Sequence, residues 1–190
     1  LIKNGLVYYP EKGSTYCCVT EPKGEHRELF TFDKWDEKRE YELEKYQQSK
    51  TAWLPECDTC RYHEKVMGHS VRTLENENWS LVSDDDENIK TAIIKTSNLC
   101  NLACRMCGPN VSTKWQQVVA ANSPNGFYEE ESTILEQTTV DDMMYMKKYV
   151  LTEHLEHISF SGGEPMLSKW NVEILQYLID NNLCKNITFG

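Results

Sequence analysis

Three cysteines within eight residues are the part of this sequence best suited to chemistry. Cys100, Cys104 and Cys107 have the spacing C-x3-C-x2-C and follow an apolar, β-branched run at residues 91–96. Cysteine thiolates hold iron–sulfur clusters, and three of them leave one iron of a [4Fe–4S] cluster without a protein ligand. The spacing therefore predicts a cluster with one open iron. Zinc is the alternative, but a structural zinc site needs a fourth ligand, and the histidines are distant in the sequence.

A second group of cysteines lies nearer the start of the chain. Cys17 and Cys18 are adjacent, and Cys57 and Cys60 form a C-x2-C pair, a common half-site for a metal. Zinc and a pair of buried thiols are the alternatives there. Cys184 follows a predicted helix, and we expect it to be a half-buried thiol. Because we expect no export signal, these tight groups favour metal sites in a reducing cytoplasm over disulfides.

A glycine-rich turn is the second motif that could bind a ligand. Gly162, Gly163, Glu164 and Pro165 come directly after a predicted strand at residues 157–160. Glycines allow the backbone to approach a ligand closely. A backbone carbonyl, or the carboxylate of Glu164, can accept hydrogen bonds from an ammonium group. The turn by itself is equally typical of an ordinary strand-to-helix connection.

Together the two motifs resemble those of the radical S-adenosylmethionine (radical SAM) enzymes. In that family the residue before the third cysteine is usually aromatic, and here it is Met106. The resemblance implies that Cys100, Cys104 and Cys107 hold a [4Fe–4S] cluster and that the methionine part of S-adenosylmethionine binds the open iron. It places residues 162–165 beside the amino group of that ligand. The implied reaction is reductive cleavage to methionine and a 5′-deoxyadenosyl radical, with flavodoxin or ferredoxin as the electron donor.

The sequence around these cysteines is similar to the corresponding segment in the subgroup of the family that carries twitch or SPASM modules. This resemblance implies an auxiliary iron–sulfur cluster held by Cys17, Cys18, Cys57 and Cys60, although the module usually follows the barrel and here precedes it. Members of the subgroup often modify peptides or proteins, so we expect a peptide or protein substrate. The alternative is a non-catalytic iron–sulfur electron-transfer protein or a zinc-binding protein.

The elements that position these motifs follow from the sequence pattern. Strands are predicted at residues 5–9, 14–20, 91–96, 157–160 and 185–190, with the first two forming a hairpin. Helices are predicted at residues 36–49, 111–121, 140–154 and 169–182, with a weaker one at 64–78, and the helix at 140–154 carries a methionine-rich core face. Strands that alternate with helices predict a parallel sheet, in which loops at the carboxyl ends of neighbouring strands meet. The cysteine loop and the Gly-Gly-Glu-Pro turn both lie at such ends.

The predicted fold class is α/β, as the beginning of a partial (β/α) radical SAM barrel after a small α+β module. We divide the chain into a cysteine-rich module at residues 1–82, an acidic linker at 83–90 and the first half of the barrel at 91–190. Because the family's barrel usually has six strands and about three are present, we expect the sequence to be a fragment of a longer enzyme.

The composition is typical of a soluble globular protein. Hydrophobic residues make up 39% and charged residues 26% of the chain. No stretch is long and apolar enough to predict a membrane span. The net charge of −10 disfavours nucleic acid as a partner, because phosphates are bound by lysine and arginine.

Overall fold

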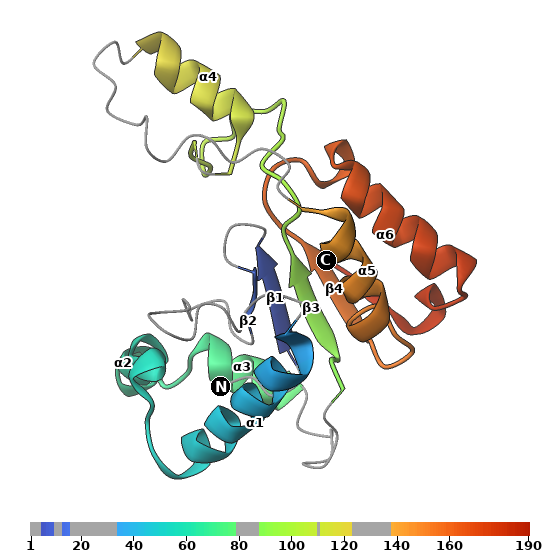
Figure 1. Ribbon diagram of the computed structural model, residues 1–190. Helices are drawn as coiled ribbons and strands as arrows, with labels where there is room; N and C mark the ends of the chain where they lie inside the picture. Colours follow the sequence, from blue (N-terminus) through green and yellow to red (C-terminus); the bar gives the residue numbers. More distant parts are fainter. Residues whose placement is uncertain (1–4, 10–12, 16–33, 79–87, 110, 123–137) are drawn as a thin grey trace.

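The computed structural model describes residues 5–9, 13–15, 34–78, 88–109, 111–122 and 138–190. They form a mixed α/β structure around a five-stranded sheet with the order β2-β1-β3-β4-β5 (Figure 1). Four strands run parallel, and β2 is antiparallel at one edge. The strands are β1 Gly5–Tyr9, β2 Gly13–Thr15, β3 Thr91–Ile94, β4 His157–Phe160 and β5 Thr188–Phe189.

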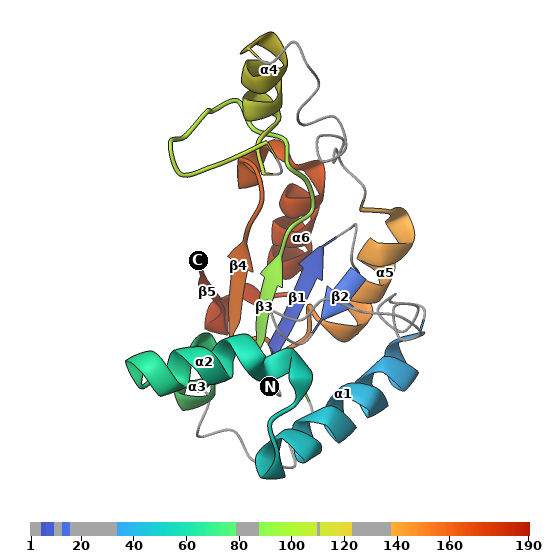
Figure 2. The same ribbon diagram turned by 90° about the vertical axis from the view of Figure 1, so that its left-hand side faces the viewer.

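Helices cover one face of this sheet and lie at both of its ends. They are α1 Trp35–Thr51, α2 Asp58–Met67, α3 Val71–Asn78, α4 Thr113–Asn122, α5 Val140–Tyr149 and α6 Lys169–Asp180. The pair α5 and α6 covers one face, α1 to α3 gather at the end where the parallel strands begin, and α4 projects beyond the other end (Figure 2). Within the described ranges, no helix combines the length and apolar character that a bilayer span requires.

The core lies between the sheet and the helices α5 and α6. Side chains alternate along a strand, so Ala92 and Ile94 of β3 face the same side and are fully buried there. Met146 of α5 and Ile174 of α6 are buried in the same cluster. The prediction that the methionine-rich helix serves the core is therefore confirmed, because Met143 and Met146 are the buried residues of α5.

The first strand of the chain belongs to this same sheet. β1 pairs with β3 in parallel, with Leu6 opposite Ala92, and the predicted hairpin brings β2 to the outer side of β1. The division predicted at residues 83–90 therefore falls between two strands that are neighbours in one sheet. Residues 79–87 and most of the strand predicted at 14–20 lie outside the described residues.

The weak helix predicted at residues 64–78 consists of two helices. Gly68 ends α2 with a left-handed φ of 80°, which glycine adopts without steric cost, and α3 begins at Val71. An ion pair between Glu64 and Arg72, with 2.7 Å between Oε2 and Nη2, holds α2 against α3. Gly68 was the available signal in the sequence for this break, because glycine commonly ends a helix.

Candidate functional site

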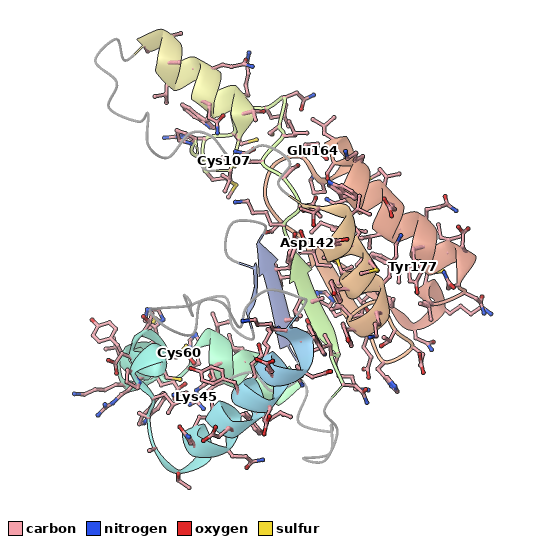
Figure 3. The ribbon with its side chains drawn as sticks, viewed as in Figure 1. Lys45, Cys60, Cys107, Asp142, Glu164 and Tyr177 are labelled. Atoms are coloured by element: carbon pink, nitrogen blue, oxygen red, sulfur yellow. The ribbon has the colours of Figure 1, made fainter. Side chains whose placement is uncertain are left out.

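The two motifs lie at the same edge of the sheet. The cysteine loop leaves β3, the Gly-Gly-Glu-Pro turn leaves β4, and these strands are parallel neighbours with Ile94 opposite Phe160. Figure 3 shows Cys107 and Glu164 at the end toward which the parallel strands point. The prediction that the strand order brings the motifs together is therefore confirmed.

Backbone hydrogen bonds join the turn directly to the start of the cysteine loop. The amide of Gly163 donates to the carbonyl of Ser97 at 3.3 Å, and the amide of Glu164 donates to the carbonyl of Leu99 at 2.7 Å. Leu99 immediately precedes Cys100 in the chain. The turn thus continues the pairing of β3 and β4 beyond the ends of the strands, and it fixes where the cysteine loop begins.

This close contact explains the two glycines. Gly162 has a φ of 107°, and a Cβ atom there would lie 2.4 Å from the carbonyl oxygen of Ser97 and 2.8 Å from Cγ of Lys95. A Cβ atom on Gly163 would lie 2.0 Å from the carbonyl oxygen of Leu99. Both distances are shorter than any real Cβ contact, so a side chain at either position would push the turn away from the loop.

Helix α4 anchors the cysteine loop from the other side. The hydroxyl of Thr113 accepts a hydrogen bond from the amide of Cys100 and donates one to its carbonyl, both at 3.0 Å. The indole Nε1 of Trp115 donates to the carbonyl of Cys104 at 2.8 Å. Ser112 is the N-cap of α4, as its Oγ accepts the amide of Trp115 at 3.2 Å. The loop backbone is therefore fixed at the first and second cysteines.

The cysteine side chains remain accessible within this fixed backbone. Cys104 is exposed, and Cys100 and Cys107 are half-buried. The amide of Leu102 donates a hydrogen bond to Sγ of Cys100 at 3.4 Å. Met106, the departure from the radical SAM signature, is 92% exposed.

The donor set of the loop fits a metal cluster in its chemistry. Three thiol groups sit on one short segment that is anchored at its base, and an amide already donates to one of the sulfurs. Among the residues that the structure describes, no three His, Cys, Asp or Glu side chains come close enough to bind a metal ion together. Binding would therefore draw the three sulfurs together, as is usual when a metal organises its own ligands.

Comparisons of the chain with models of known protein families, with curated proteins and with solved structures found no match. The functional argument therefore rests on the residues and contacts of this edge of the sheet.

On the side of the turn, Glu164 is the N-cap of a short 3-10 helix, Pro165–Leu167, and Oε1 of its carboxylate accepts the amide of Met166 at 3.5 Å. Lys95 is 5% exposed, and its Cγ and Cδ atoms pack against Gly162.

Several residues of the site escape detection in the sequence pattern. Thr113 and Trp115 were expected only as parts of a helix, and none of the residues of α4 is buried. Asn171 stands on the buried face of α6, where its neighbours along that face are apolar. A polar residue within an apolar stripe was the available signal for Asn171.

The second group of cysteines is placed apart from this edge. Cys57 ends the short 3-10 helix Pro55–Cys57 and is the N-cap of α2, Cys60 lies in the first turn of α2, and each is 5% exposed. Figure 3 shows Cys60 at the end of the molecule opposite to Cys107. Cys17 and Cys18 lie outside the described residues, so the auxiliary site stays a prediction.

Proposed function

We propose that this protein is a radical SAM enzyme. Cys100, Cys104 and Cys107 would hold a [4Fe–4S] cluster, and the turn at residues 162–165 would bind the methionine part of S-adenosylmethionine. When bound, the cluster supplies the electron that cleaves the sulfonium bond of S-adenosylmethionine and so yields the 5′-deoxyadenosyl radical. The parallel strands would be the first part of a partial (β/α) barrel.

One observation carries the proposal: the backbone of the glycine turn is hydrogen-bonded to the base of a loop with three cysteines. The bond from Glu164 to Leu99 is 2.7 Å long and ends one residue before Cys100. A ligand bound at an iron on the loop would therefore meet the edge of the turn.

The residues of this edge have distinct tasks under the proposal. The anchored backbone at Cys100 and Cys104 would hold the cluster at a fixed distance from the sheet. The carboxylate of Glu164 and the carbonyl groups of the turn would accept hydrogen bonds from the ligand's ammonium group. Lys95, whose Cγ faces Gly162, would supply the positive charge that pairs with the ligand's carboxylate.

The same proposal extends to a second cluster, an electron donor and a substrate. Cys57 and Cys60, with Cys17 and Cys18, would hold an auxiliary iron–sulfur cluster at the opposite end of the sheet. The electron donor would be a flavodoxin or a ferredoxin, and the substrate a peptide or a protein. Iron analysis tests the second cluster, because a Cys57→Ala, Cys60→Ala double variant should lower the iron content from about eight to about four atoms per chain.

The decisive experiment is anaerobic reconstitution of the full chain with iron and sulfide. The protein is reduced with dithionite, given S-adenosylmethionine and assayed for 5′-deoxyadenosine by chromatography. The wild type should form the nucleoside, and the Cys104→Ala variant should form none. Cys184→Ala is the matched control, because Cys184 is a half-buried thiol packed against the core. A full-length, cluster-loaded wild-type protein that forms no nucleoside would refute the proposal and favour a non-catalytic iron–sulfur protein.

A further inference from the structure

A chain of buried polar side chains runs behind the glycine turn. Thr96 follows β3, while Ser168 and Asn171 begin α6, and all three are at most 1% exposed. The hydroxyl oxygens of Thr96 and Ser168 are 2.7 Å apart, and Oγ1 of Thr96 is 2.8 Å from Oδ1 of Asn171. Nδ2 of Asn171 donates to the carbonyl of Pro165 at 3.0 Å. The chain of contacts therefore ends on the last residue of the Gly-Gly-Glu-Pro turn.

Donor and acceptor chemistry fixes the direction of every bond in this chain. The carbonyl of Pro165 only accepts, so the amide nitrogen of Asn171 must face it and Oδ1 must face Thr96. Oδ1 also only accepts, so it takes the single hydroxyl proton of Thr96. Ser168 must then donate to Thr96. The protons run in one direction, from Ser168 through Thr96 and Asn171 to Pro165, and bonds in such a chain strengthen one another.

The position of Ser168 shows that these bonds replace a more usual arrangement. Ser168 is the N-cap of α6, where a serine side chain normally accepts a backbone amide of the first turn, but it makes no such capping bond. Its hydroxyl is directed to Thr96 instead. The network also reaches β1, because Thr138 donates to the carbonyl of Thr96 at 3.1 Å and accepts the hydroxyl of Tyr8 at 3.3 Å.

We infer that Asn171 is a positioning residue that holds the carbonyl of Pro165, and with it the Gly-Gly-Glu-Pro turn, against the cysteine loop. The inference rests on the proposed function for the ligand at this edge. Asn171 does not act on the ligand directly. Its side-chain amide holds the carbonyl of Pro165 on the side of α6. The bond from the amide of Glu164 to the carbonyl of Leu99 holds the same turn on the side of the cysteine loop. Loss of the contact on the side of α6 leaves the turn free to move away from the loop.

Three variants of the full chain separate this role from general stability. Asn171→Leu has a similar volume and removes the donor to Pro165, while Thr96 and Ser168 can still pair with each other. Thr96→Val removes the hydroxyl that orients Asn171 but leaves the amide in place. Thr96→Ser keeps the hydroxyl and is the conservative rescue. The expected order of effects is Asn171→Leu, then Thr96→Val, with Thr96→Ser like the wild type.

The first measurement uses the protein without any cofactor. Amide hydrogen exchange at Gly163 and Glu164 should become about tenfold faster in Asn171→Leu. The amide of Val150, which bonds the carbonyl of Met146 at 2.9 Å in α5, serves as the reference and should not change. If exchange at Gly163 and Glu164 rises only in parallel with Val150, the residue is merely structural and the inference is wrong.

The second measurement is the cleavage of S-adenosylmethionine by the reconstituted protein. The turn binds a part of the ligand that does not react, so Asn171→Leu should raise KM about tenfold and change kcat less than about twofold. An unchanged KM, or a fall in kcat alone, would overturn the positioning role. If the wild type cleaves no S-adenosylmethionine, the proposed function fails, while the exchange experiment still decides whether Asn171 holds the turn.

Discussion

Replacement of Gly163 by alanine is the most direct test of the contact between the two motifs. The added Cβ atom would lie 2.0 Å from the carbonyl oxygen of Leu99, and this distance has to lengthen to at least 3.0 Å. The same carbonyl accepts the amide of Glu164 at 2.7 Å. A shift of about 1 Å lengthens this bond to about 3.7 Å, beyond hydrogen-bond range. The variant therefore separates the turn from the base of the cysteine loop.

The expected loss of stability follows from this displacement. Breaking the bond to Leu99 leaves a backbone donor and acceptor without partners, which costs about 1–3 kcal/mol. Residual compression of backbone angles adds about 1 kcal/mol. We expect the free energy of unfolding to fall by about 2–4 kcal/mol in Gly163→Ala. Urea unfolding followed by tryptophan fluorescence measures this change.

Gly68→Ala is the matched control for the glycine experiment. Gly68 has a φ of 80°, but among the described residues no non-adjacent atom lies within 4 Å of its added Cβ, so only backbone strain of about 1 kcal/mol is expected. Amide exchange at Glu164 should accelerate in Gly163→Ala and stay unchanged in Gly68→Ala. Equal losses of stability in the two variants, with unchanged exchange at Glu164, would refute the steric reasoning.

Three further predictions concern residues around the site and between the helices. Burial by itself would raise the pKa of Glu64. The hydrogen bonds from Arg72 and Ser70 outweigh this effect of burial and lower the pKa below the ordinary value of 4.5. Protonation of Glu64 therefore favours the unfolded state, so the free energy of unfolding of the wild type should fall relative to that of Glu64→Gln as the pH drops below 4.5. Parallel curves of stability against pH for the two proteins would contradict this. Asn98 is fully buried, and its side-chain amide has no hydrogen-bond partner among the described residues, so Asn98→Leu should stabilise the cofactor-free protein by about 1 kcal/mol. Urea unfolding measures this change, and a loss of stability would show that the amide is paired. Trp115→Phe removes the 2.8 Å bond to the carbonyl of Cys104 and should accelerate amide exchange in the cysteine loop about fivefold, and unchanged exchange would show that the indole does not anchor the loop.

Local patterns in the sequence determined the elements and the chemistry that they carry. β-branched runs, periodic apolar residues and turn residues predicted the positions of β3, β4, α5 and α6. Alternation of strands and helices then predicted parallel pairing, and parallel pairing placed the cysteine loop and the glycine turn at one edge. These features are local or follow from chain topology, so they are visible without coordinates.

Other features were decided only by the tertiary structure, because they depend on residues far apart in the sequence. The pairing of β1 with β3 joins Leu6 to Ala92 across the predicted linker, and no local pattern specifies such a partner. Ser168 occupies a position that favours helix capping, yet the buried Thr96 offers its hydroxyl a partner that the sequence pattern does not reveal. The two glycines were expected to let the backbone approach a ligand closely. Only the fold shows that their hydrogen atoms face carbonyl groups at distances that no side chain can occupy, because packing, rather than propensity, brings those atoms together.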